Sequence, residues 1–286
     1  MKMTEFNQKL YYTLNGDSNV KYSVSVGKFP GGESHLNANT GSLDWGSNQA
    51  LGTASFMIHA RLQDGQDIVN VLMLKDALER VYANAQADLF IPYVPYARQD
   101  RVCVSGEALS IKVFSDMINS AGFRSVTVVD PHSNVVQAGI NNCYIWDQYS
   151  IFGSVKHDWS DVIVVAPDMG ASKKCEEFAK LARAKDVIYF NKSRELSTGK
   201  IKKIELLGDR VKGEQLFILD DIVDGGRTFL GMLPSLEGNK VELAVTHGIF
   251  SAGTKLLTDA FDKVYTTNSW NALLKSDGNL QVLRMQ

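Results

Sequence analysis

Short apolar runs alternate with longer amphipathic stretches along most of the chain. The runs are rich in β-branched residues, end in Gly, Pro, Asp or His, and cover residues 22–26, 87–91, 125–129, 162–166, 186–189, 215–219 and 240–245. Nearly continuous apolar runs of this length are typical of strands that are buried on both faces of a parallel sheet. Between them, amphipathic stretches predict helices over 68–85, 108–121 and 173–184. This alternation predicts an α/β fold with right-handed crossovers.

The alternation runs twice along the chain. Apolar strands that end in polar residues occur near Ile91 and Val129, and again near Val164 and Leu219. Residues 141–154 are aromatic-rich and irregular, and we interpret them as a domain boundary. The prediction is two α/β domains, residues 1–145 and 146–286, each with a mainly parallel sheet flanked by helices.

Composition narrows the class of protein. The 286 residues include 44% apolar and 22% charged residues, which is usual for a soluble globular protein. A net charge of −2 and the lack of an Arg/Lys-rich face disfavour nucleic acid and anionic membranes as partners. The three cysteines form no CxxC pair, residues 1–7 lack the apolar run of a signal peptide, and no stretch approaches the roughly 20 apolar residues of a membrane span. We expect a soluble, cytoplasmic protein.

The most informative motif is an acidic loop at residues 220–228, Asp-Asp-Ile-Val-Asp-Gly-Gly-Arg-Thr, between an apolar strand and a helix. Ligands of open α/β sheets bind at the carboxyl ends of strands. Gly225 and Gly226 let backbone N–H groups turn toward a phosphate, and a helix start adds its positive dipole end. The carboxylates then hold sugar hydroxyls or a magnesium ion shared with a diphosphate. The alternative is an acidic turn that caps a helix, with Asp224 near the N-cap.

This loop resembles the phosphoribosyl-diphosphate loop of type I phosphoribosyltransferases and of ribose-phosphate diphosphokinases. Five further segments resemble diphosphokinase motifs in the same order along the chain, between Gly27 and about Ser269: residues 91–101, 128–132, 165–170, 191–194 and 246–251. We therefore identify the chain as a shortened and divergent member of the diphosphokinase family. The resemblance implies two phosphoribosyltransferase-like domains and a homo-oligomer, a dimer or larger.

The reaction that the resemblance implies is transfer of the β,γ-diphosphate of ATP to the anomeric 1-hydroxyl of ribose 5-phosphate. Such a transfer needs positioning, charge neutralisation and a metal, which is Mg²⁺ in this family, more than covalent work by the protein. Lys192 and Arg194 fall where the family has its catalytic flexible loop, on an exposed segment after a strand; without the family they read as two solvated cations. The acceptor would be held by Asp220, Asp221, Asp224, Gly225, Gly226, Arg227 and Thr228.

The ATP-binding residues are also assigned by resemblance. Phe29 and Glu33 resemble the loop that holds adenine, although a Pro-Gly-Gly turn with a core Phe is an equal alternative on local sequence. Arg98, Gln99 and Asp100 follow two tyrosines at a strand end, where a guanidinium binds phosphate oxygens bidentately. The implied metal contacts are His132, which also contacts the triphosphate, and Asp168.

Three departures from the family pattern bear on the substrate. Gly225 stands where a threonine usually binds a terminal phosphate oxygen, and Arg227 resembles the phosphoribosyltransferase loop instead. Residues 101–106 lack most of the basic residues expected there, and Gly31 replaces an Asp or Asn. Two acceptors stay open: ribose 5-phosphate, or a larger nucleotide-linked ribose such as ADP-ribose.

Two other classes compete. A phosphoribosyltransferase would share the acidic loop, but it would not need residues 96–100, Phe29 or Glu33, or a second α/β domain. A non-catalytic regulator would be expected to have lost Lys192, Arg194 or Asp168, and all three are present. The chain contains no Walker A or GxGxxG sequence that would favour a P-loop kinase or a dinucleotide enzyme.

Overall fold

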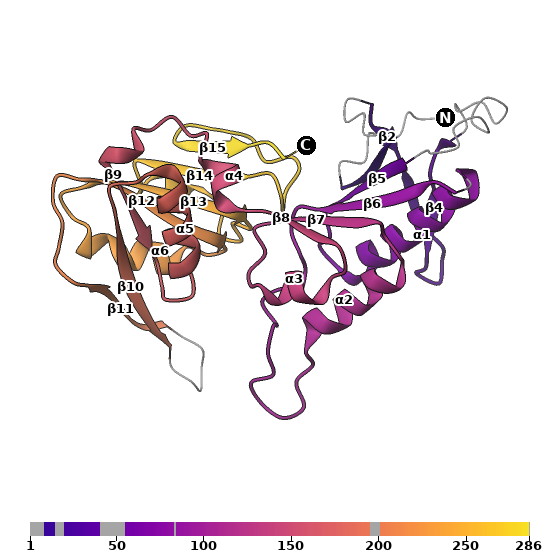
Figure 1. Ribbon diagram of the computed structural model, residues 1–286, viewed down its shortest axis with the longest axis horizontal. Helices are drawn as coiled ribbons and strands as arrows, with labels where there is room; N and C mark the ends of the chain where they lie inside the picture. The colour runs from indigo at the N-terminus through magenta and orange to yellow at the C-terminus, as the bar shows by residue number, and fades with distance from the viewer. Residues whose placement is uncertain (1–8, 15–19, 41–54, 83, 195–200, 286) are drawn as a thin grey trace. The chain divides into compact units, whose positions relative to one another are not determined.

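The computed structural model describes residues 9–14, 20–40, 55–82, 84–194 and 201–285 (Figure 1). Residues 1–7, on which the expectation about a signal peptide rests, lie outside this part. The chain divides into two compact units, Met1–Ile145 and Trp146–Met285. Within the described ranges no helix is both long and apolar enough to cross a membrane.

The N-terminal unit contains a six-stranded sheet in the order β2-β1-β5-β6-β7-β8. Its centre is parallel, because β5 pairs with β6 and β6 with β7 in one direction. The chain crosses from β5 to β6 through α1 and from β6 to β7 through α2, while β3 and β4 form a separate antiparallel hairpin. The bounds are β1 Leu10–Leu14, β2 Tyr22–Ser23, β3 Ser25–Lys28, β4 Ser34–Asn37, β5 Ser55–Ala60, α1 Gly65–Val81, β6 Gln86–Ile91, α2 Ser110–Ser120, β7 Ser125–Val129, α3 Val135–Gly139 and β8 Cys143–Trp146.

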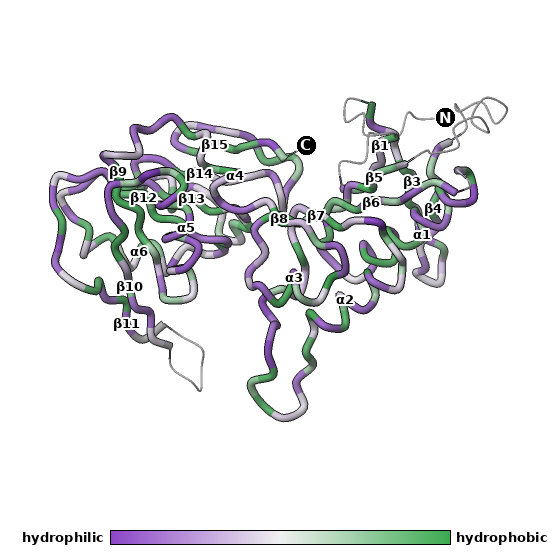
Figure 2. The backbone as a smooth tube through the Cα atoms, in the orientation of Figure 1, coloured by the Kyte–Doolittle hydropathy of each residue, from purple (hydrophilic) through white to green (hydrophobic). Residues whose placement is uncertain are grey.

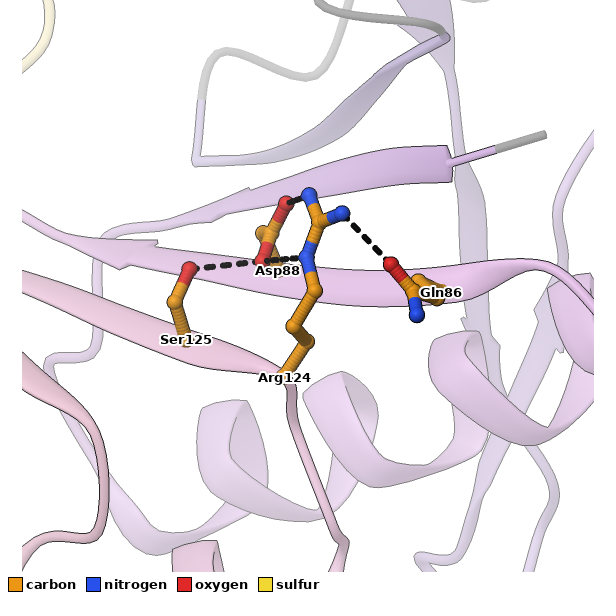
Figure 3. Close-up of polar contacts among 4 residues, drawn as sticks. All are labelled: Gln86, Asp88, Arg124 and Ser125. Atoms are coloured by element: carbon orange, nitrogen blue, oxygen red, sulfur yellow. Dashed lines mark hydrogen bonds and ion pairs between the residues drawn. The ribbon is translucent and has the colours of Figure 1, made fainter. Parts of the chain in front are cut away.

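A polar cluster joins β6 to β7 at the amino ends of these strands (Figure 3). The Arg124 guanidinium donates to Asp88 Oδ1 at 2.9 Å and to Gln86 Oε1 at 2.6 Å, and it also contacts Asp88 Oδ2. Ser125 Oγ donates to Asp88 Oδ1 at 2.6 Å. Asp88 is only 7% exposed, so these donors replace the water that the carboxylate loses on folding.

The C-terminal unit is built on a seven-stranded sheet in the order β11-β10-β9-β12-β13-β14-β15. All neighbouring strands are parallel except β10 and β11, which form an antiparallel pair. The bounds are α4 Gln148–Phe152, η3 Trp159–Asp161, β9 Val162–Ala166, α5 Ser172–Ala182, β10 Asp186–Arg194, β11 Ile201–Leu207, β12 Gln215–Val223, α6 Arg227–Met232, η4 Leu233–Ser235, β13 Lys240–Gly248, α7 Lys255–Thr258, β14 Lys263–Thr267 and β15 Leu280–Leu283.

Hydrophobic residues concentrate on the strands of both units (Figure 2). All five residues of β9 are buried, and so are eight of the nine in β13. This full burial confirms the predicted character of the parallel strands, because helices or loops cover both faces of such a sheet. The α/β fold, with two mainly parallel sheets, is confirmed.

Two local predictions are wrong. Residues 22–26 do not form one buried parallel strand: they divide between β2, which is half-buried and antiparallel to β1, and β3, which is mostly exposed and antiparallel to β4. Residues 141–154 are not irregular, because they contain the edge strand β8 and the short helix α4. In β8 the exposed and half-buried side chains alternate, as expected at a sheet edge, so the segment lacks a continuous apolar run.

Candidate functional site

Three loops of the C-terminal unit meet at the carboxyl edge of its sheet. Strand β9 lies between β10 and β12, with Ala166 opposite Tyr189 and Val165 opposite Ile218. Asp168 follows β9 by two residues, and the neighbouring strands continue past it. Residues at the same level of neighbouring strands lie close together, because adjacent strands are about 5 Å apart. The register therefore places Asp168 between Lys192 of β10 and the aspartates of β12.

Lys192 is not a solvated cation. Strand β10 continues to Arg194 because it pairs with β11, so Lys192 lies in a regular strand opposite Ile204. Its ammonium forms an ion pair with Asp168 Oδ2, and the two side chains are 12% and 25% exposed. The prediction that Lys192 lies on an exposed segment after the strand was wrong, because β11 supplies backbone hydrogen bonds that extend β10 through this residue. The backbone of Arg194 pairs with Ile201, and its side chain lies outside the described part.

Asp220 and Asp221 lie inside β12 and not after it, since the ladder to β13 continues through Asp220–Val245 and Ile222–His247. The Asp221 backbone N–H donates to Asp220 Oδ1 at 2.9 Å. Burial raises the pKa of Asp220 well above its usual value, and the negative charges of Asp221 and Asp168 raise it further. A crowd of carboxylates of this kind favours a cation or a hydroxyl donor as its ligand.

The rest of the acidic loop turns sharply after β12. Asp224 is exposed, and its Oδ1 accepts from the backbone N–H of Ser251 at 3.3 Å, which ties the loop to the segment after β13. Gly226 has a φ of +74°, and a Cβ there would lie 2.8 Å from the Leu257 side chain, so glycine is required. A Cβ on Gly225 would meet no atom within 4 Å. Helix α6 then begins at Arg227, which is exposed, and Thr228 is half-buried.

In the N-terminal unit, Phe29 and Glu33 lie in the turn between β3 and β4. The backbone N–H of Phe29 donates to the Glu33 carbonyl at 2.8 Å, which closes the turn. Phe29 is 53% exposed, and its ring meets the edge of His35 at 5.5 Å between centroids. The alternative of a core phenylalanine is therefore excluded, and an exposed aromatic face is present for stacking.

The other residues predicted to bind ATP follow the neighbouring strands β6 and β7. Arg98 and Gln99 are exposed and Asp100 is half-buried; Tyr96, with a φ of +63°, makes the turn that precedes them. His132 is exposed after β7. Because Ile91 pairs with Val128, these two loops leave one edge of the sheet side by side.

The described residues contain no group of three or more His, Cys, Asp or Glu side chains that would enclose a metal ion. A closed cage is not the expected arrangement for Mg²⁺, which keeps several waters and takes one or two carboxylates together with substrate phosphate oxygens. Such an open site would need only one or two of the carboxylates of Asp168, Asp220 and Asp221, whose negative charges together with burial raise the pKa of Asp220.

The comparisons with known proteins agree with this geometry. Residues 5–122 match the N-terminal domain of ribose phosphate pyrophosphokinase. A ribose-phosphate pyrophosphokinase of Pasteurella multocida is 28% identical over 278 residues, which cover 92% of this chain and 81% of that protein. Its counterpart in Corynebacterium efficiens is 28% identical over 243 residues, 81% of this chain and 74% of that protein. This chain belongs to the ribose-phosphate pyrophosphokinase family.

A solved structure shares the fold of this chain over 93% of its length. The phosphoribosylpyrophosphate synthetase of Mycobacterium smegmatis superposes with a TM-score of 0.75, covering 93% of this chain and 87% of that one, at 23% identity. Both units of the present chain are therefore accounted for by one known architecture.

The sequence did not assign roles to a buried polar cluster beside the acidic loop. His247 Nδ1 lies 2.8 Å from Ser269 Oγ, and Thr267 Oγ1 donates to the Thr246 carbonyl at 2.7 Å; all four residues are at most 2% exposed. The cluster joins the carboxyl ends of β13 and β14, and β13 in turn pairs with β12. Its only sequence signal was the motif at 246–251, which carries no role without the register.

Proposed function

We propose that this protein transfers the β,γ-diphosphate of ATP to the anomeric 1-hydroxyl of ribose 5-phosphate, which gives phosphoribosyl pyrophosphate and AMP. The observation that carries the proposal is the convergence of Lys192, Asp168 and the β12 aspartates at one sheet edge, in a chain of the ribose-phosphate pyrophosphokinase family. The sugar O1 attacks the β-phosphorus, the bond from that phosphorus to the α,β-bridging oxygen breaks, and AMP leaves with the oxygen. The hydroxyl proton goes to solvent.

The acidic loop is proposed to hold the acceptor. Asp220 and Asp221 accept hydrogen bonds from the ribose hydroxyls, and the loop at 224–228 receives the 5-phosphate on its backbone N–H groups. In this proposal the carboxylates of Asp220 and Asp221 lie at the sugar and not at the phosphate, which avoids repulsion between these like charges. Because sugar hydroxyls are donors, their binding compensates for the desolvation of Asp220.

Lys192 and Arg194 are proposed to stabilise the negative charge on the transferred diphosphate. A cation that is already in place as the charge develops lowers the barrier. Asp168 in the C-terminal unit and His132 in the N-terminal unit are each proposed to contact Mg²⁺, which would neutralise phosphate charge when bound. Phe29, Glu33, Arg98, Gln99 and Asp100 are proposed to bind ATP, with adenine on the exposed face of Phe29.

A second acceptor is favoured by one observation, the open space at Gly225. A threonine hydroxyl there would bind a terminal oxygen of a monoester. Its absence leaves room for a substituted phosphate, as in ADP-ribose, with the same chemistry at O1. A homo-oligomer remains a prediction that light scattering of the purified protein would test.

The test is to incubate the protein with γ-³²P-labelled ATP, Mg²⁺ and each acceptor separately, and to follow AMP and the labelled sugar by mass spectrometry and chromatography. We expect label in the sugar product and one AMP for each product formed. Label in inorganic phosphate alone would indicate ATP hydrolysis. Absence of AMP with both acceptors would refute the diphosphokinase function, and product with ADP-ribose alone would replace the first acceptor by the second.

A further inference from the structure

Two residues with different partners in the proposed reaction contact each other in the free protein. Asp168 is the proposed metal contact and Lys192 the proposed diphosphate contact, yet the Lys192 ammonium is paired with Asp168 Oδ2. The remaining oxygen, Oδ1, already accepts from the backbone N–H groups of Gly170 at 2.9 Å and Ala171 at 3.2 Å. Both oxygens of Asp168 are therefore engaged before any substrate binds.

A metal ion and Lys192 compete for the same oxygen. An ammonium group has three donors and no acceptor, so it cannot bridge to a cation. A dication on Oδ2 would also stand within a few ångströms of the ammonium and repel it, at a site where both side chains are largely shielded from water. The backbone donors on Oδ1 are set by the turn after β9 and leave with difficulty, so Lys192 is the partner that can be exchanged.

We propose that the Asp168–Lys192 ion pair is a latch that the divalent metal opens: Asp168 holds Lys192 in the free protein and exchanges it for the metal, which releases the ammonium toward the diphosphate. The inference rests on the proposed function and adds an order of events to it. Lys192 can make this change without altering the fold, because β10 is held by β9 and β11 on its two sides while the four-carbon side chain rotates.

The chain offers a matched control on the neighbouring strand. Lys203 of β11 pairs with Glu205 of the same strand, and these side chains are 63% and 46% exposed. Removal of Lys203 deletes one positive charge from the same hairpin without touching Asp168. Lys192→Met and Lys203→Met therefore separate a local exchange from a general change in electrostatic potential.

The first experiment measures Mn²⁺ binding by electron paramagnetic resonance, without ATP or sugar, in the wild type, Lys192→Met, Lys203→Met and Asp168→Asn. We expect Lys192→Met to bind Mn²⁺ about fivefold more tightly, the factor for an ion pair at the upper end of the range for exposed pairs. Lys203→Met should match the wild type, and Asp168→Asn should bind more weakly than all three. Equal shifts in the two lysine variants, weaker binding by Lys192→Met, or unchanged binding by Asp168→Asn would each overturn the latch.

The second experiment detects the released lysine in the wild type, so it does not depend on the folding of a variant. Acetylation by a succinimidyl ester is timed with and without Mg²⁺, and Lys192 and Lys203 are quantified by peptide mass spectrometry in the same sample. We expect Mg²⁺ to accelerate labelling of Lys192 about fivefold and to leave Lys203 unchanged. In Asp168→Asn, Lys192 should react fast under both conditions. A Lys192 rate that Mg²⁺ does not change overturns the proposal.

These results are independent of turnover. A wild type that forms AMP while Lys192 is insensitive to Mg²⁺ would refute the latch and leave the diphosphokinase function standing. A Mg²⁺-sensitive Lys192 in a protein that forms no AMP with either acceptor would do the reverse.

Discussion

The pKa values of buried carboxylates are shifted in opposite directions at the two ends of the C-terminal sheet. At the amino end, Glu242 of β13 is 3% exposed and is paired with His157 Nε2 at 2.9 Å and Lys240 Nζ at 2.8 Å. Burial acts to raise the pKa of Glu242, but the hydrogen bonds from His157 and Lys240 outweigh it and the pKa is lowered. At the carboxyl end, burial and like charges raise the pKa of Asp220.

The difference separates structural from functional carboxylates. A compensated carboxylate stabilises the folded protein, whereas a crowded one costs stability and is retained where a ligand supplies the missing positive charge or donors. The N-terminal sheet repeats the first arrangement at its amino end, where Arg124 and Ser125 compensate Asp88 (Figure 3). Burial of a carboxylate alone would not have distinguished these sites; their partners do.

The largest expected effect is on turnover at the carboxyl end. Lys192→Met should lower kcat about 10²- to 10³-fold, the cost of removing one preorganised group that stabilises developing charge. AMP release at saturating substrate measures it. Lys203→Met is the control and should keep wild-type turnover. A Lys192→Met enzyme within threefold of the wild type would remove this residue from the reaction.

At the amino end, Glu242→Gln should lower the free energy of unfolding by about 3 kcal/mol, because it leaves His157 and Lys240 beside a buried neutral group. Urea unfolding followed by tryptophan fluorescence measures this loss, and one of the four tryptophans, Trp159, contacts His157 at 5.1 Å between ring centroids. Lys240→Met, which removes the half-exposed partner, should cost about 1 kcal/mol or less. The surviving folded fraction of Glu242→Gln should keep the wild-type KM for its acceptor.

The same pair predicts a pH dependence. The folded pKa of Glu242 is lowered, so its stabilisation is fully present above the ordinary glutamate pKa of about 4.3 and is lost as the pH falls through the folded value. Between about pH 6 and pH 3, the free energy of unfolding should therefore fall less steeply with falling pH for Glu242→Gln than for the wild type. Parallel curves would show that Glu242 titrates alike in both states.

At the carboxyl end of the sheet, Asp220→Asn should raise the free energy of unfolding, whereas Glu242→Gln at the amino end lowers it. The folded pKa of Asp220 is raised, so its charge opposes folding at neutral pH and is relieved as the pH falls. The variant should be more stable than the wild type by about 1 kcal/mol at pH 7 while it binds the acceptor less tightly. Loss of stability in Asp220→Asn would mean that this carboxylate is compensated after all.

The smallest expected effect comes from Gly225→Thr. The new side chain has open space, and one added hydrogen bond of about 1 kcal/mol should lower the KM for ribose 5-phosphate about fivefold. The KM for ADP-ribose should not fall. Gly225→Ala, which fills space without adding a donor, is the control; an equal effect of both variants would assign the change to shape.

The sequence by itself determined the parallel strands and the positions of the acidic loop, because a sheet covered on both faces demands continuous apolar runs and its loops demand glycine and polar residues. It missed β1, β4, β5, β8, β11, β14 and β15, and it ended β10, β12 and β13 too early. The position at which a strand ends depends on which neighbouring strand supplies its backbone hydrogen bonds. Pairing with β11 extends β10 to Arg194, and pairing with β13 extends β12 through Asp220 and Asp221 to Val223.

The sequence also proposed Lys192, Asp168 and Asp220 as site residues through their motifs, without a relation among them. Only the tertiary structure decided that Asp168 stands between the other two, because β9 lies between β10 and β12 in space and not in chain order. The direction in which the pKa of Asp220 and of Glu242 is shifted also depends on the packed sheet, since desolvation and the nearest opposite charge belong to it. Local motifs identify the residues, but the electrostatic field around each of them comes from strands that are distant in sequence.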